Sequence, residues 1–154
     1  MLIRTLFRVA LMMLALAPSF AADSGAPGSG GTADVTVAGL KSGEGMLFVS
    51  LYLNDEGYPG DWAKAFASRR VPASEAVDGK MELTFEDVPP GPLVVTVIHD
   101  ANGDGKLSTN FLGIPKEAYG FSNNAKSLFG PPKFEDATLD MTAGETLAVR
   151  IDLK

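Results

Sequence analysis

The residues with the clearest chemical potential lie in the segment 99–107. Asp100, Asn102 and Asp104 occupy positions 1, 3 and 5 of the calcium-loop pattern D-x-[DN]-x-[DN]-G, and Gly105 stands at position 6, where the chain turns sharply. In such a turn alternate side chains direct their oxygens inward, and glycine takes a backbone conformation that other residues avoid. The spacing therefore predicts Asp100, Asn102 and Asp104 as ligands of a Ca²⁺ ion.

The loop departs from an EF-hand at position 12, where Phe111 replaces the bidentate glutamate. A looser calcium loop would need further oxygens from Asn110, Glu117 or a main-chain carbonyl, while Ser108 at position 9 could hold a water. With two carboxylates inside the loop we expect weak binding, with a Kd of about 10⁻⁴–10⁻³ M. The alternative is that aspartate, asparagine and glycine form Asx-turns here without an ion.

His99 and Asp100 also allow a hydrolase interpretation, because an imidazole beside a carboxylate can act as a general base. The pair would need a nucleophile such as Ser108, Thr109 or Ser122, yet the sequence has no G-x-S-x-G elbow. Neighbouring strand residues point to opposite faces, so Asp100 would orient His99 only where the strand breaks. We therefore assign no catalytic residue and interpret His99 as a histidine at the end of a strand, with the hydrolase as an alternative.

Alternating apolar and polar residues predict the strands that must position these side chains. Val35 and Val37 alternate with polar neighbours, whereas Met46–Leu53 and Leu93–Ile98 are apolar on both faces, as buried strands are. Strands are expected at 34–39, 46–53, 81–86, 93–98, 137–141 and 147–153, with an edge piece at 70–72 and a helix at 61–68. Short strands with Gly and Pro between them predict an antiparallel, prealbumin/immunoglobulin-like β-sandwich of six to seven strands.

The segment 100–135 has no sustained period, although connections within a domain usually run about four to six residues. Aromatic residues recur in it among Gly and Pro, which argues against disorder. We expect one long ordered loop that forms the recognition surface for a glycan, a peptide or an envelope protein. The expected ligand-binding residues are His99, Asn110, Glu117, Tyr119, Phe121, Asn123 and Asn124. A flap that only closes one end of the sandwich is the structural alternative.

The N-terminal residues are typical of a secretory signal. Arg4 and Arg8 precede nine apolar residues at Val9–Ala17, and the small residues Ser19 and Ala21 fit cleavage after Ala21. This apolar run is too short for a transmembrane helix, which needs about 20 residues, so no membrane-spanning segment is expected. We predict a signal peptide over 1–21, a flexible linker over 22–33, one domain over 34–154, and a periplasmic or secreted location.

The composition excludes several other classes of function. The chain carries 13 Lys+Arg against 19 Asp+Glu, a net charge of −6 that becomes −8 when Arg4 and Arg8 leave with the signal. An acidic domain is unsuited to nucleic acid, whose phosphates need a basic face. The absence of cysteine excludes disulfides and thiolate metal sites, and a single histidine excludes multi-histidine metal centres.

The segments His99–Leu107, Asn110–Glu117 (NFLGIPKE), Tyr119–Ala125 (YGFSNNA) and Phe129–Phe134 (FGPPKF) together resemble a bacterial family of exported domains of unknown function. The resemblance covers about residues 34–154, and it implies a single exported β-sandwich domain but no activity. Leu83–Asp100 is also similar to prealbumin-like modules, such as carboxypeptidase regulatory and adhesin B-type domains. We therefore expect a non-enzymatic envelope binding or accessory module. Its recognition surface is the segment 100–135, and a bound calcium ion would stiffen that loop. A hydrolase and a purely structural envelope protein are the alternatives.

Overall fold

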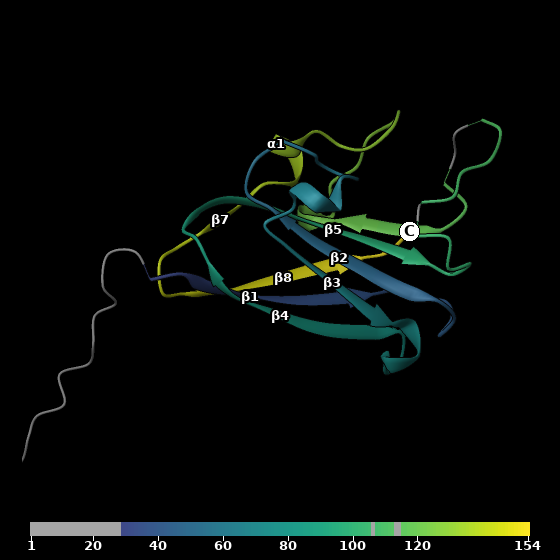
Figure 1. Ribbon diagram of the computed structural model, residues 1–154, viewed down its shortest axis with the longest axis horizontal. Coiled ribbons are helices and arrows are strands. Elements are labelled where there is room, and N and C mark those ends of the chain that lie inside the picture. The colour runs from purple at the N-terminus through teal and green to yellow at the C-terminus, as the bar shows by residue number, and fades with distance from the viewer. Residues whose placement is uncertain (1–28, 106, 113–114) are drawn as a thin grey trace, which may run out of the picture.

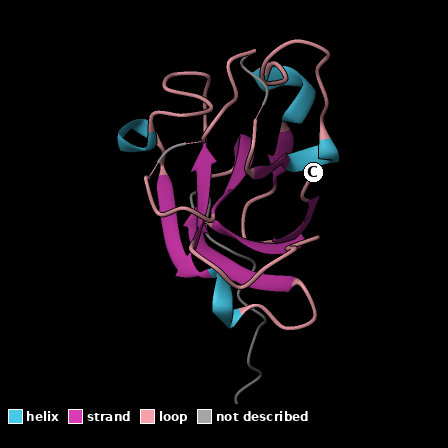
Figure 2. Cartoon of the chain, turned by 90° about the vertical axis from the view of Figure 1, so that its right-hand side faces the viewer, coloured by secondary structure: helices cyan, strands magenta, loops and turns pink. Residues whose placement is uncertain are grey.

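The computed structural model describes residues 29–105, 107–112 and 115–154, and it consists mainly of strands with short helical turns at their ends (Figures 1 and 2). The expected signal peptide (1–21) and the first part of the expected linker (22–28) lie outside these residues. Within the described ranges, no helix has the length and apolar character that crossing a membrane requires.

One layer is a three-stranded sheet in the order β4 (Lys80–Val88), β1 (Gly31–Ala38) and β8 (Thr146–Asp152). The β1 strand begins at Gly31, inside the expected linker, and its buried Ala33 already belongs to the core. β1 runs antiparallel to β4 but parallel to β8, so this one pair departs from the expected antiparallel arrangement.

The second layer is a five-stranded sheet. It contains β3 (Ala67–Pro72), β2 (Met46–Tyr52), β5 (Gly91–Asp100) and β6 (Ala118–Phe121) in that order, and β7 (Leu139–Met141) also pairs with β5. The pairs in this layer are antiparallel. The all-β sandwich is thus confirmed, with eight strands in place of the expected six or seven.

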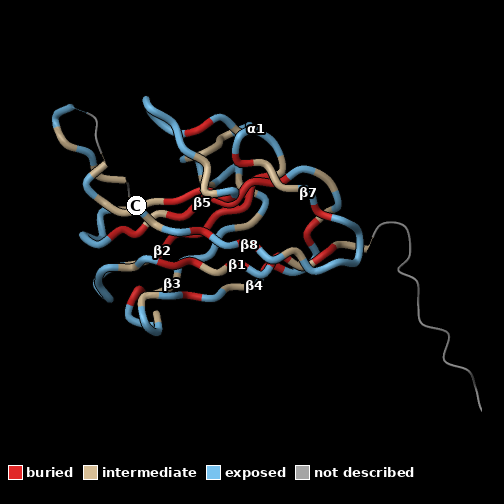
Figure 3. The backbone as a smooth tube through the Cα atoms, turned by 180° about the vertical axis from the view of Figure 1, so that it is seen from behind, coloured by how far each residue is buried: buried red, intermediate tan, exposed pale blue. Residues whose placement is uncertain are grey.

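The core lies between the two sheets, where the buried positions of facing strands alternate with exposed ones (Figure 3). In β1 and β8 the buried residues include Val35, Val37, Val149 and Ile151. In β2 and β5 both faces are buried over much of their length. These two strands therefore need a cover on the side that faces away from the other sheet.

Chain segments outside the strands supply that cover. Figure 1 places α1 (Phe134–Ala137) on the side of β2 and β5 that faces away from β1 and β4. There Val94, Phe121 and Ala137 are buried together, with Tyr58, Tyr119, Ala125 and Phe134 packed against them. We call these seven residues the outer cluster. Tyr58 is central to it, because its ring meets Tyr52, Phe121 and Phe134 edge-on and its hydroxyl donates to the Pro132 carbonyl.

Two expectations about local structure need correction. The helix expected at 61–68 is a single 3-10 turn, Trp62–Lys64, because the chain is extended again at Ala65 and pairs with β2 from Ala67 onward. The segment 100–135 is not one continuous loop, since it contains β6, the 3-10 turn Ser122–Asn124 and the start of α1. A third 3-10 turn, Ala73–Glu75, follows β3.

Candidate functional site

The Asp100 carboxylate lies at the end of β5, where the strand passes into the loop, and it is buried. Its Oδ1 accepts the backbone N–H groups of Gly103 (2.7 Å) and Asp104 (3.2 Å), and its Oδ2 accepts that of Gly105 (2.7 Å). Gly105 has φ +75°, in the left-handed region that glycine adopts readily. The carboxylate therefore folds the loop back onto the strand end.

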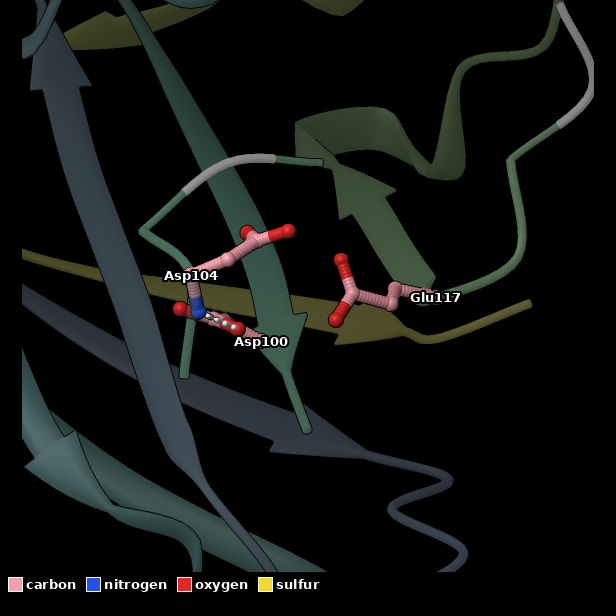
Figure 4. A group of neighbouring side chains, drawn as sticks. All are labelled: Asp100, Asp104 and Glu117. Carbon is pink, nitrogen blue, oxygen red and sulfur yellow. Dashed lines mark hydrogen bonds between the residues drawn. The ribbon is translucent and has the colours of Figure 1, made fainter. Parts of the chain in front are cut away.

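Two further carboxylates join Asp100. Oxygens of Asp100, Asp104 and Glu117 lie within 4.8 Å of one another, and we call these three residues the carboxylate cluster. In Figure 4 the carboxylates of Asp104 and Glu117 approach each other from two sides, with Asp100 beside Asp104. Glu117 reaches the loop because β6 pairs with β5 in a register that sets Ala118 opposite His99.

Ser108 and Asn102 complete the surroundings of the cluster through donated hydrogen bonds, while Asn102 Oδ1 accepts the Asp104 backbone N–H (2.9 Å). The Ser108 hydroxyl donates to Asp104 Oδ2 (3.0 Å), and its backbone N–H donates to Glu117 Oε2 (2.8 Å). The Asn102 amide donates to Asp104 Oδ2 (3.1 Å) and to the Ser108 hydroxyl (2.9 Å). The structure thus brings together the three residues expected as metal ligands and adds Ser108 and Glu117 to them.

This arrangement has the chemistry of a site for a hard cation, since Ca²⁺ is bound by carboxylate, amide and hydroxyl oxygens. A carboxylate offers about four acceptor positions, and the three N–H groups on Asp100 leave one of them for an ion. The Asn110 Oδ1 accepts the Leu112 N–H (2.9 Å) and caps its own turn. Glu117, one of the additional ligands that the sequence suggested, belongs to the cluster.

His99 projects from the opposite side of β5, in alternation with Asp100. It is buried, and its Nε2 lies 2.8 Å from the Glu44 carbonyl oxygen. A carbonyl only accepts, so Nε2–H is the donor in this hydrogen bond. His99 also lines a smaller hollow of about 460 Å³ with Lys41 and Lys154. The hydrogen bonds of His99 and Asp100 therefore run to different parts of the chain.

Two of the hydroxyls considered as nucleophiles hold structural positions. The Ser122 hydroxyl is buried, accepts the Val95 N–H and donates to the Ala137 carbonyl, so it joins β5 to α1. Ser108 belongs to the surroundings of the carboxylate cluster, as described above. Thr109 lines the groove described next.

An open apolar groove of about 940 Å³ lies over the outer face of the five-stranded sheet, beside the carboxylate cluster. Ile98 of β5 and Tyr119 of β6 contribute from the sheet, and Trp62 contributes from the 3-10 turn. Trp62 is held there by stacking on Phe48 at 4.4 Å between ring centroids. Leu112 comes from the 107–112 loop, whereas Leu128 and Phe129 come from the loop before α1. We refer to this site as the apolar groove.

Some of the residues expected to bind ligand line the groove, and others form hydrogen bonds with the backbone of the sandwich. Tyr119 and Phe121 line the apolar groove. Asn123 and Asn124 both have positive φ, and their amides bond to backbone instead: Asn123 donates to the Thr138 carbonyl, and Asn124 bonds to Arg150 and Asp152 of β8. Asn124 thereby covers part of the edge of β8.

Burial also changes the ionisation of two tyrosines beneath the groove wall. Burial raises the pKa of Tyr52 to about 12, with a smaller contribution from the nearby Asp61 carboxylate. The pKa of Tyr58 is likewise raised to about 12 by burial, and then by Asp136 and Tyr52. Both hydroxyls therefore stay protonated at neutral pH and donate to the carbonyls of Pro59 and Pro132.

The sequence interpretation did not assign Trp62, Leu112, Leu128 or Phe129 to a site. One signal was available, because Leu128–Phe129 is a pair of large apolar residues next to Gly130 and two prolines, where no regular element can bury it. Trp62 gave no such signal, since the pattern around it suggested one face of a helix.

The fold and the site together define a β-sandwich protein with a carboxylate cluster and an apolar groove at the end of one strand. The family model of uncharacterized proteins conserved in bacteria (DUF2141) matches residues 35–148, and the chain belongs to this family. The matched region includes the strands of both sheets, with β1 and β8 only in part, and every residue of the carboxylate cluster. Searches of curated proteins and of solved structures find no match to the chain.

Proposed function

We propose that this protein is a periplasmic or secreted binding module whose recognition site is the apolar groove. The observation that carries the proposal is the groove itself, an open hollow of about 940 Å³ walled by residues from five separate parts of the chain. Sites for small ligands typically measure about 300–1,000 Å³ and are mostly apolar with a few polar groups. Thr96 and Asp61 are among the polar residues of this lining.

The lining favours a ligand that presents apolar groups, such as the large side chains of a peptide, over a glycan. Trp62, Tyr119 and Phe129 offer ring surface, while Ile98 and Leu112 offer aliphatic surface. A glycan would require many hydrogen bonds, and the amides of Asn123 and Asn124 already bond to backbone. An exported location, as the N-terminal sequence predicts, would present this groove to peptides of the envelope.

We further propose that Ca²⁺ binds the carboxylate cluster and stiffens one wall of the groove. The support is the set of oxygens around Asp104: the carboxylates of Asp100 and Glu117 and the Ser108 hydroxyl, with Asn102 Oδ1 on the Asp104 backbone N–H. Residues 107 and 109, which flank Ser108, line the groove. An ion that joins the loop to Glu117 would therefore restrict the motion of this wall.

The groove is tested with the fluorescent apolar probe 1-anilinonaphthalene-8-sulfonate and with a variant that fills the hollow. Gly60 lines the groove, and a Cβ placed there would meet no heavy atom within 4 Å, so Gly60→Phe adds bulk without overlap. We expect the unchanged chain to bind the probe, with quenching of the sole tryptophan, Trp62, and Gly60→Phe to bind it at least about tenfold more weakly.

Ser74→Phe is the matched control, because Ser74 is exposed in the 3-10 turn after β3 and does not line the groove. It adds the same phenyl group elsewhere on the surface and should leave probe affinity unchanged. Equal affinity of the unchanged chain and Gly60→Phe, or probe binding that leaves Trp62 emission unchanged, would show that the groove is not a binding site. Peptide and glycan arrays, read with the unchanged chain and with Gly60→Phe, then distinguish the two ligand classes.

A further inference from the structure

Two loop tips expose large apolar side chains to solvent almost completely. At one tip Phe111 is 94% and Leu112 67% exposed; at the other Leu128 is 94% and Phe129 91% exposed. We call these pairs the first and the second tip. Single exposed apolar residues are common on protein surfaces, but adjacent pairs at two neighbouring tips indicate an interaction surface.

The two tips lie on either side of the apolar groove and project in the same direction. Leu112 from the first tip and Leu128 and Phe129 from the second all line the apolar groove. The loops that carry them extend beyond the sheets in the same direction, as both Figure 1 and Figure 3 show. A flat apolar or interfacial surface could therefore meet both tips at once.

The charges around the tips differ from those of the rest of the domain. Between residues 105 and 134 four lysines stand against a single carboxylate: Lys106, Lys116, Lys126 and Lys133 against Glu117. This stretch is thus basic within a chain whose net charge is −6. Lys116, Lys126 and Lys133 are exposed. Within the described residues the ion pairs are Lys64–Glu56 and Arg150–Asp152, so none of these three lysines is neutralised by one.

The acidic groups of the same part of the molecule lie at the base of the loops. Asp100, Asp104 and Glu117 are gathered in the carboxylate cluster, where they accept hydrogen bonds from the loop itself. Glu135 and Asp136 lie in α1, behind the second tip. The tips therefore combine apolar ends with nearby lysines that form no ion pair among the described residues.

From this we infer that the two tips dock the protein on the surface of an anionic lipid bilayer. Aromatic and aliphatic side chains insert into the boundary between headgroups and acyl chains, and lysines are attracted to anionic headgroups. A protein partner fits less well, because lysine is depleted at the cores of protein interfaces. The inference goes beyond the proposed function, since it concerns the tips and not a ligand inside the groove.

Vesicle binding of the chain 22–154, which retains every strand of both sheets, tests the inference. Co-sedimentation is measured with vesicles of phosphatidylcholine alone and of phosphatidylcholine with one quarter phosphatidylglycerol, in EDTA. We expect binding to the anionic vesicles. The double variants Phe111→Ser/Leu112→Ser and Leu128→Ser/Phe129→Ser should each lower the partition coefficient at least about tenfold, because they remove apolar area that the bilayer would bury. Lys126→Glu should lower it about fivefold or more.

Matched controls use the same chemistry elsewhere on the molecule. Val77, 72% exposed at the turn before β4, is changed to Ser, and Lys80 is changed to Glu. Both should bind vesicles like the unchanged chain. The substituted tip side chains are solvent-exposed, and thermal melting checks that each variant is folded. Failure to bind anionic vesicles, equal binding to both vesicle types, or undiminished binding by the tip variants would overturn the inference.

Phe111→Ser separates this inference from the proposed function. Phe111 does not line the groove, so this variant should lose vesicle affinity and keep its affinity for the fluorescent probe. Gly60→Phe should do the reverse. If the probe test fails but Phe111→Ser still weakens vesicle binding, the groove proposal is refuted and the docking inference stands.

Discussion

If calcium binds the carboxylate cluster, Glu117→Gln should have opposite effects on stability in the presence and in the absence of the ion. Glu117→Gln removes one of three negative charges whose oxygens lie within 4.8 Å. It can keep the hydrogen bond from the Ser108 N–H (2.8 Å), because an amide oxygen also accepts, and it gives up only the longer one from the Asn102 N–H to Oε1 (3.5 Å). The metal-free protein should therefore be as stable as before or more stable, since like charges repel.

The gain from calcium in the unchanged chain can be estimated from linkage. An ion that binds only the folded state stabilises it by RT ln(1 + [L]/Kd). With the expected Kd of about 10⁻⁴–10⁻³ M and Ca²⁺ at about 5 mM, the free energy of unfolding should rise by ~1–2.3 kcal/mol. For a domain of this size, that corresponds to an increase in Tm of roughly 3–10 °C. Glu117→Gln should lose most of this increase, because the ion loses a charged ligand.

The assay is differential scanning calorimetry in EDTA and in about 5 mM CaCl₂, with MgCl₂ at the same concentration as an ionic-strength control. Glu82→Gln is the matched variant, because Glu82 is exposed on β4 and is not part of the cluster. It should keep the full calcium increment. An unchanged Tm of the wild-type chain in calcium, or a Glu117→Gln variant with an undiminished increment, would refute the reasoning and leave the loop as a set of Asx-turns.

Two further predictions concern the cover of the five-stranded sheet. Ser122→Ala leaves the buried Val95 N–H and Ala137 carbonyl without their shared partner. Each unsatisfied group costs about 1–3 kcal/mol, so urea denaturation should show a loss of ~2–6 kcal/mol. A loss below about 0.5 kcal/mol would mean that water replaces the hydroxyl. Unfolding lowers the pKa of Tyr52 and Tyr58 from about 12 toward 10.0, so at alkaline pH both tyrosines release their protons on unfolding. The free energy of unfolding should therefore fall as pH rises from 10 through 12. Tyr58→Phe should make the fall of Tm over this range shallower, and an unchanged slope would contradict the assignment.

The strands were predictable wherever burial follows the strand period. Val35 and Val37 of β1, and Val149 and Ile151 of β8, alternate with polar residues because one face meets the core. The parallel pairing of these two strands was not predictable, because it joins residues more than a hundred positions apart and leaves no local signal. The four-residue β6 was missed for a similar reason: AYGF is too short to show a period, and β5 alone makes it a strand.

The candidate site was predictable in part. Asp100, Asn102 and Asp104 converge because their spacing in one tight turn dictates it, and the structure places them together. Glu117 could only be named as one of several options, since its approach depends on the pairing of β5 with β6. The apolar groove could not be predicted, because its walls come from segments around residues 60, 98, 112, 120 and 129 that meet only in the folded chain.

The outer face of β5 connects the outer cluster, the apolar groove and the carboxylate cluster. Along it, Val94 is buried in the outer cluster, Ile98 lies in the groove, and Asp100 begins the carboxylate cluster. Side chains two residues apart on a strand share a face, so one straight element sets the spacing between cover, groove and acidic loop. β6 repeats this arrangement beside it, with Phe121 in the cluster and Tyr119 in the groove, while Glu117 directly before the strand joins the carboxylates. A change that shifts the register of β6 against β5 would therefore disturb the groove and the carboxylate cluster together, whereas a change at Phe111, which lines neither, would leave both in place.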